Sequence, residues 1–212
     1  MEITWYGQAC FRIRDGGRSV VTDPYSPEVG LKLPRLSTSV VTISHDHADH
    51  NCVKGLRGSP YVISGPGEYE VGGIFFFGVP TFHDDRGGQE RDKNTAYVIE
   101  FGDLTVCHLG DLGHVPSQEQ IEQLAGADIL LIPVGGRGTL AGGKAAEVVS
   151  ILEPAIVIPM HYKVPGLVAR IETAARFLRE MGVEKSEPLE TLKIAKSQLP
   201  EQTRVTLLAP RQ

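Results

Sequence analysis

The chain has 212 residues, 41% of them hydrophobic and 22% charged, which is typical of a soluble globular protein with a core of ordinary size. The net charge of -5 makes a nucleic-acid partner unexpected, because nucleic-acid-binding domains usually present a basic face. No apolar run approaches the ~20 residues that span a bilayer, and residues 1–10 lack the basic start and apolar core of a signal peptide. The three cysteines show no CxxC spacing, as expected of reduced thiols. We therefore expect a cytoplasmic protein without a membrane partner.

The first half of the chain is predicted to be rich in β-strands. Strand-like stretches separated by Gly, Pro and Asp lie at 1–5, 10–13, 19–22, 39–44, 61–64, 73–77, 96–101 and 104–108. The Asp-Gly-Gly run at 15–17 predicts a hairpin turn, and the stretch 39–44 is typical of a buried strand.

The second half is predicted to alternate strands and helices. Ser117 and Gln120 form a capping-box pattern for a helix that ends near Gly126. Strands are predicted at 128–134, 155–159 and 204–208, and helices at 144–152 and 166–181, the last with one apolar stripe and Gly182 as its stop. No linker or repeat interrupts this order. The pattern predicts one α/β domain over residues 1–212, with two sheets flanked by helices.

The strongest chemical signal is the run His-Asp-His-Ala-Asp-His at 45–50, directly after the predicted buried strand. Imidazole nitrogen and carboxylate oxygen are natural ligands of zinc and similar divalent ions. In an extended turn His45 and His47 point the same way and can share one ion. If a helix starts near Asp49, that residue and His50 point toward a second ion. A solvated polar turn is the alternative, but three of the chain's seven histidines within six positions disfavour chance.

Three further ligand-type residues follow apolar strands: His83, Asp111 and His161. Loops at strand ends are where rigid sheets present functional groups. Each residue alone has another interpretation, as a surface or core histidine or as a turn-forming aspartate. The recurrence of the pattern favours all three as metal ligands.

Taken in order, HxHxDH, a later His, Gly-Asp and Pro-x-His-Tyr resemble the metallo-β-lactamase superfamily. The opening Ile-Thr-Trp-Tyr-Gly-Gln-Ala-Cys-Phe and the Thr-Asp-Pro at 22–24 extend this resemblance over nearly the whole chain. It is greatest to the small single-domain branch of ascorbate-6-phosphate lactonase-like hydrolases. The resemblance implies an αββα four-layer sandwich with two divalent metal ions at one edge. Zinc is the expected metal, and manganese or iron also suits these ligands.

The resemblance also implies a role for each matching residue. The first metal would be held by His45, His47 and His83, the second by Asp49, His50 and His161, with Asp111 as the bridge. Asp23 would support the ligands from behind. His108 and His114 flank Asp111 and compete with His83, and for His108 we favour support or packing. His114 is a candidate proton donor to a leaving group, with a surface role as the alternative.

Paired metals lower the pKa of a shared water, so the predicted reaction is hydrolysis, with Asp49 binding metal and orienting the nucleophile. Cations near the ligands favour a small anionic substrate, a phosphodiester or a phosphorylated lactone: Arg86, Arg91, Lys93, Arg137 and Lys163. Solvation of mobile loops is the alternative for these cations. At the level of function, the alternative is a non-hydrolytic metal-binding or sensing member of the same fold.

A GxxxxGK pattern at 138–144 is a competing signal, because it lies between a predicted strand and a predicted helix. Ala145 stands where a nucleotide-binding loop has the Ser or Thr that binds magnesium. The resemblance instead implies a turn close to the active-site mouth here, from which Arg137 and Thr139 would contact substrate. A plain Gly-rich turn without such contacts is the alternative. The sequence makes no prediction of the oligomeric state.

Overall fold

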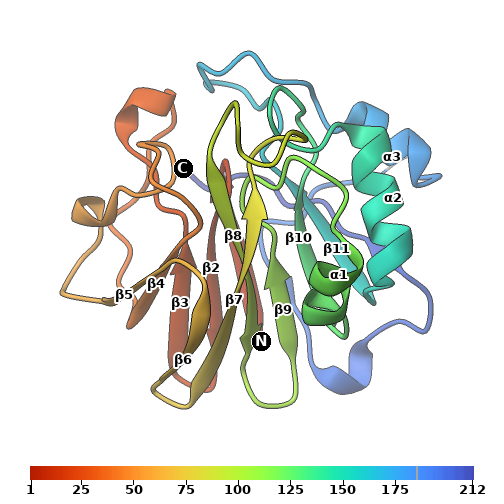
Figure 1. Cartoon of the computed structure of the whole chain (residues 1–212). Coiled ribbons are helices and arrows are strands. Elements are labelled where there is room, and N and C mark those ends of the chain that lie inside the picture. The colour runs from red at the N-terminus through yellow and green to blue at the C-terminus, as the bar shows by residue number, and fades with distance from the viewer. Residues whose placement is uncertain (185) are drawn as a thin grey trace.

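The computed structural model describes residues 1–184 and 186–212 and shows two β-sheets packed face to face (Figure 1). The first sheet has the order β12-β1-β2-β3-β4-β5. Its strands are β1 (Glu2–Gly7), β2 (Cys10–Asp15), β3 (Arg18–Thr22), β4 (Val40–Ile43), β5 (Tyr61–Ser64) and β12 (Leu192–Lys193). β1, β2 and β3 pair antiparallel, whereas β3, β4 and β5 run parallel.

The second sheet has the order β13-β11-β10-β9-β8-β7-β6. Its strands are β6 (Gly67–Val71), β7 (Ile74–Phe82), β8 (Lys93–Glu100), β9 (Thr105–His108), β10 (Ile129–Pro133), β11 (Ile156–Met160) and β13 (Arg204–Val205). β8 is antiparallel to both β7 and β9, while β9, β10 and β11 are parallel. Consequently β7, β9, β10 and β11 all end at the same edge of the sheet.

The central strands of the second sheet, β8 to β11, are buried on both faces, and side-chain alternation assigns their residues to two cores. Along β10, Ile129 and Leu131 pack in the core between the sheets, whereas Leu130 and Ile132 pack in a second core that includes helical residues. This explains why the stretch is apolar throughout and shows no alternation in the sequence.

The α-helices lie on the outer side of the second sheet, beside β9, β10 and β11 (Figure 1). They are α1 (Gln118–Leu124), α2 (Gly142–Leu152) and α3 (Ala175–Glu180). α1 begins with the predicted capping box between Ser117 and Gln120. Between β3 and β5 the structure has two single-turn 3-10 helices, η1 (Pro27–Val29) and η2 (Val53–Gly55), and a third, η3 (Lys196–Gln198), follows β12. The two sheets and the helical layer confirm the predicted α/β sandwich.

The helix predicted at 166–181 is wrong for its first half, because α3 begins only at Ala175. The preceding backbone pairs elsewhere: Glu172 donates its N–H to the carbonyl of Gly135 (2.9 Å) and accepts from the N–H of Lys163 (2.8 Å). The apolar residues of the predicted stripe are divided between two cores instead of lying on one helix face. Leu167 packs between the sheets, whereas Ala174 packs in the helical core.

Other strand and helix boundaries also moved. The strand predicted at 73–77 continues to Phe82, the helix predicted at 144–152 starts at Gly142, and the strand predicted at 204–208 is only two residues long. β6 and β12 were not predicted, and β6 shows no regular alternation of buried and exposed residues. None of the helices in the described part of the chain combines the length and apolar character needed to cross a bilayer.

Candidate metal centre

The candidate ligands lie in loops where strands of both sheets end. The segment 45–50 follows β4, His83 follows β7, Asp111 lies three residues beyond β9, and His161 follows β11 directly. His161 has a φ of 50°, a left-handed conformation that turns the chain sharply at the strand end. The sheet topology thereby assembles residues that are more than a hundred positions apart in the sequence.

The seven predicted ligands form three overlapping groups. In each group the ligand atoms lie within 4.8 Å of one another, and the groups are His45/His47/His83, His45/His50/Asp111 and Asp49/His50/His161. Asp111 lies at the centre. Its Oδ2 is 3.1 Å from His83 Nε2, 3.3 Å from His161 Nε2 and 3.4 Å from His50 Nε2. One carboxylate thus faces imidazoles from both predicted ligand sets.

Several ligand atoms in this cluster are buried and have no hydrogen-bond partner among the described residues. They include Nε2 of His45, His50 and His161 and Oδ1 of Asp111. Buried polar atoms are normally satisfied, because an unpaired one loses its hydration without compensation. Nitrogen and oxygen lone pairs converging on one point fit divalent cations.

A layer of hydrogen bonds behind the ligands orients them. Asp23 is fully buried, and its Oδ2 lies 2.9 Å from His50 Nδ1 and accepts from Ser44 Oγ at 2.5 Å. The same Ser44 hydroxyl lies 2.9 Å from His45 Nδ1, and His83 Nδ1 donates to the carbonyl of Gly138 at 3.1 Å. These contacts engage Nδ1 of His45, His50 and His83 and leave Nε2 of these three rings facing the centre of the cluster. The structure places Asp23 where the resemblance implied.

Burial and charge act in opposite directions on the titratable groups of the cluster. Burial lowers the pKa of His45 to about 3, so its imidazole is neutral and keeps a lone pair for a cation. At His50 burial also lowers the pKa, but the carboxylates of Asp111 and Asp23 outweigh it and raise the pKa well above its usual value. Burial would raise the pKa of Asp111, yet His161 and His50 hold it well below its usual value.

The two other histidines near Asp111 lie outside the three ligand groups. His108 is fully buried, donates from Nε2 to the carbonyl of Ala9 (2.9 Å) and packs edge-on against Phe11. His114 accepts from the N–H of Phe82 at Nε2 (3.2 Å), and its Nδ1 lies 3.0 Å from the carbonyl of Val115. The structure therefore brings His83, and not His108, into the cluster. The catalytic role of His114 stays a prediction, since backbone atoms engage both of its ring nitrogens.

Besides Ser44, two further residues that contact the ligands were not singled out from the sequence. Gln8 donates from Nε2 to Asp49 Oδ2 (3.1 Å), and Asn94 accepts at Oδ1 from the N–H of Asp111 (2.9 Å). Gln8 lies in the turn between β1 and β2, where polar residues are ordinary, and Asn94 lies inside β8. No local sequence signal distinguishes them from turn or strand residues.

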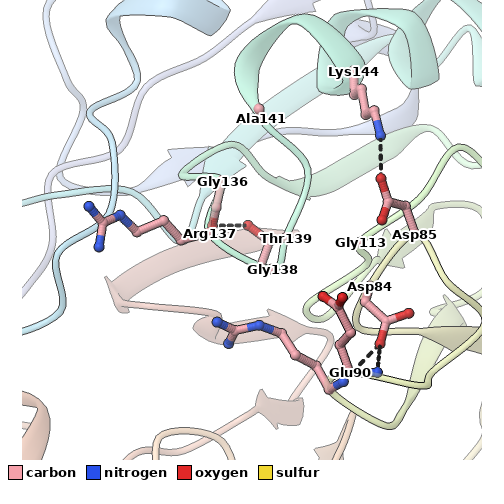
Figure 2. A pocket seen from close by; sticks show the side chains of 11 residues that line it. Asp84, Asp85, Glu90, Gly113, Gly136, Arg137, Gly138, Thr139, Ala141 and Lys144 are labelled. Carbon is pink, nitrogen blue, oxygen red and sulfur yellow. Dashed lines mark hydrogen bonds and ion pairs between the residues drawn. The ribbon is translucent and has the colours of Figure 1, made fainter.

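Two cavities lie beside the cluster and share Arg91. One, of about 290 Å³, is lined by His45 and His47 together with Arg91 and Lys93. The other, of about 500 Å³, lies at the start of α2 and is lined by Arg91, the turn at 136–139 and Lys144 (Figure 2). The side chain of Arg91 lies against Gly138 in the lining of the larger cavity.

The cations around these cavities differ in whether they form an ion pair. Arg86 pairs with Glu90 (3.0 Å) with two thirds of its side chain exposed, at 66%. Lys144 of the GxxxxGK pattern pairs with Asp85 (3.1 Å), and Arg137 points away from that pair (Figure 2). Within residues 1–184 and 186–212, Arg91 and Arg137 line the larger cavity without an ion-pair partner. These two arginines are available to a negatively charged ligand.

Lys163, the last of the predicted cations, is engaged within its own loop. Its ammonium group donates to the carbonyls of Leu167 and Ala169. Ala145, beside the GxxxxGK pattern, is fully buried in the helical core and offers no oxygen to a magnesium ion. The Gly-rich turn instead holds the candidate ligand His83 in place through the carbonyl of Gly138.

The chain was compared with families of known proteins and with solved structures. Residues 2–161 match the β-lactamase superfamily domain. A Thermotoga maritima crystal structure, assigned as a zinc-dependent hydrolase of the metallo-β-lactamase superfamily, superposes with a TM-score of 0.82 and 36% identity, covering 98% of this chain and 97% of the other. A UPF0173 protein of Pyrococcus abyssi is 31% identical over 78% of this chain and 85% of its own length.

A further relative is a UPF0173 metal-dependent hydrolase of Methanopyrus kandleri, 26% identical over 87% of this chain and 94% of its own length. The family match at residues 2–161 includes the segment 45–50 and reaches His161, so it spans all of the clustered ligands. The chain therefore belongs to the metallo-β-lactamase superfamily and is a metal-dependent hydrolase.

Proposed function

We propose that the protein hydrolyses a small anionic ester, a phosphodiester or a phosphorylated lactone, at a centre of two divalent metal ions. The observation that carries this proposal is the position of Asp111, whose Oδ2 lies within 3.4 Å of imidazole nitrogens from both ligand sets. A carboxylate shared in this way suits two neighbouring cations better than one.

The proposed first position uses His45, His47 and His83, and the second uses Asp49, His50 and His161, with Asp111 between them. When bound, two such ions supply a water of lowered pKa and polarise the scissile group. Zinc is the first choice, because the Thermotoga maritima relative is assigned as zinc-dependent. Manganese and iron accept the same donor types.

Within this centre the chain's own residues divide the remaining work. The side chain of Asp49 is 35% exposed, so it faces the open side of the cluster, and we assign it to align the attacking group. Asp23 and Ser44 hold the imidazoles of His50 and His45 at fixed orientation. Such fixed geometry reduces the reorganisation needed on reaching the transition state.

The anionic character of the substrate rests on Arg91 and Arg137. Arg91 lines the cavity that also contains His45 and His47, so an anion held there lies next to the ligand cluster. A guanidinium group can donate two parallel hydrogen bonds to phosphate, which makes arginine suited to this role.

A matched pair of esters with one leaving group tests the proposal, for example p-nitrophenyl acetate and bis(p-nitrophenyl) phosphate. A charge-assisted hydrogen bond contributes about 1.5–3 kcal/mol, so Arg91→Ala should lower kcat/KM for the anionic ester by roughly tenfold to a hundredfold. The acetate should be little affected. Arg86→Ala is the control, because Arg86 is paired with Glu90 and faces solvent. If the wild type shows no preference for the anionic ester, the proposal of an anionic substrate is wrong, but the hydrolase activity is not contradicted.

A further inference from the structure

Gln8 occupies an unusual position for a turn residue. It joins β1 to β2, yet it is only 1% exposed and has a φ of 49°. Left-handed backbone is uncommon outside glycine and persists when surrounding contacts hold it. Those contacts lead to the second metal position.

The side chain of Gln8 contacts one ligand of that position. Its amide lies 3.1 Å from Asp49 Oδ2. A carboxylate accepts hydrogen bonds, so the amide nitrogen must be the atom facing Asp49 and the amide oxygen must face the other way. That oxygen is buried and has no hydrogen-bond partner among the described residues. The contact fixes which of the two oxygens of Asp49 can turn toward a cation.

The main chain of Gln8 contacts a second ligand. Its carbonyl accepts from the N–H of His161 (3.1 Å) and from Trp5 Nε1 (2.9 Å). The Trp5 ring also packs against the ring of Tyr162, with centroids 5.0 Å apart. The β1–β2 turn therefore fixes the end of β11 at the residue where the chain turns into His161.

We propose that Gln8 is a positioning residue that assembles the second metal position, acting through Asp49 and His161. This inference rests on the proposed dinuclear function. Gln8 has no such role at the first position, because Ser44 and Gly138 hold the ligands His45 and His83 there. Asp23 supports both positions through His50 and Ser44, but Gln8 contacts ligands of the second position alone, so loss of Gln8 should affect that position.

The test titrates cobalt(II) into metal-free protein and follows visible absorption, with zinc competition to give affinities. Gln8→Leu removes both polar atoms of the side chain, and Gln8→Asn shortens it while tolerating the left-handed backbone. In both variants the affinity for one metal equivalent should fall tenfold or more, as is usual for groups that orient ligands. The other equivalent should bind as in the wild type. Thr4→Val, which removes a buried hydroxyl from the preceding strand β1, should change neither affinity.

A double variant separates positioning from general loss of structure. If Gln8 acts partly through the Asp49 side chain, Gln8→Leu should weaken metal binding less in an Asp49→Asn background than in the wild type. If the effects of Gln8→Leu and Asp49→Asn on the free energy of metal binding are fully additive, the inference is overturned. Wild-type affinity for both metal equivalents in Gln8→Leu and Gln8→Asn also overturns it. A wild type that takes up only one metal overturns the dinuclear function itself. Two equivalents bound equally well with and without Gln8 would overturn only the role of Gln8.

Discussion

Metal removal should lower the thermal stability of the protein, and two single-histidine variants show whether the cluster is responsible. The ligands come from the loops after β4, β7, β9 and β11, so they meet only in the folded state. A metal that binds the folded and not the unfolded chain stabilises the fold by mass action. His83→Ala removes a clustered ligand, whereas His108→Ala removes an equally buried imidazole outside the cluster.

The size of the effect follows from binding energy and chain length. Free metal at 100 times Kd stabilises by about 2.7 kcal/mol per site, hence about 5 kcal/mol for two sites. For a domain of about 200 residues, 1 kcal/mol shifts Tm by roughly 2–4 °C. Chelation should therefore lower Tm by about 10–20 °C. In His83→Ala, chelation should lower Tm by about half of this amount or less. His108→Ala loses one buried hydrogen bond and leaves a cavity, which costs about 2–5 kcal/mol in both forms, so most of the shift should persist.

The assay is differential scanning calorimetry of each protein after chelation and after return of zinc, with bound metal measured by elemental analysis. The comparison uses the difference between the two forms of one protein, so a general loss of stability cancels. Equal Tm values with and without metal in the wild type would refute the reasoning. A shift that survives His83→Ala but disappears in His108→Ala would move the third ligand of the first metal to His108.

Three further outcomes are expected. Asp49→Asn should abolish ester hydrolysis while circular dichroism stays native, because the side chain is partly exposed and the substitution keeps its shape; retained turnover would exclude Asp49 from catalysis. At Asp84, burial raises the pKa, but hydrogen bonds from the N–H groups of Arg86, Gly88, Glu90 and Arg91 outweigh it and hold the pKa below its usual value. The ionised Asp84 therefore stabilises the fold above about pH 4, and this contribution is lost as the pH falls toward the lower pKa of the folded state. In urea unfolding, the difference in free energy of unfolding between the wild type and Asp84→Asn should shrink below about pH 4. In Gly135→Ala the new Cβ would collide with the carbonyl oxygen of His161, so Tm and metal content should both fall, whereas Gly17→Ala, which meets no neighbour, should leave the metal content unchanged.

The sequence alone determined the ligand types and much of the framework. The segment 45–50 concentrates its ligands in one turn, and His83, Asp111 and His161 follow strands whose apolar composition marks them as buried. These signals are local, because composition and spacing within one element decide which face is buried and where the element ends. For that reason the capping box of α1 and the strands before the ligands were predictable.

Apart from Asp23, only the tertiary structure decided which residues support the ligands and which cations have no ion-pair partner. The contact from Gln8 to Asp49 joins positions 41 apart, and that from His83 to Gly138 joins positions 55 apart. Among the described cations, Arg86 forms an ion pair with Glu90 whereas Arg91 has no ion-pair partner, although both lie in the same loop. The first half of the helix predicted at 166–181 does not form for a related reason, since the backbone of Glu172 bonds to Gly135 and Lys163. Local periodicity predicts an apolar face, but the partner that covers it depends on how distant segments pack.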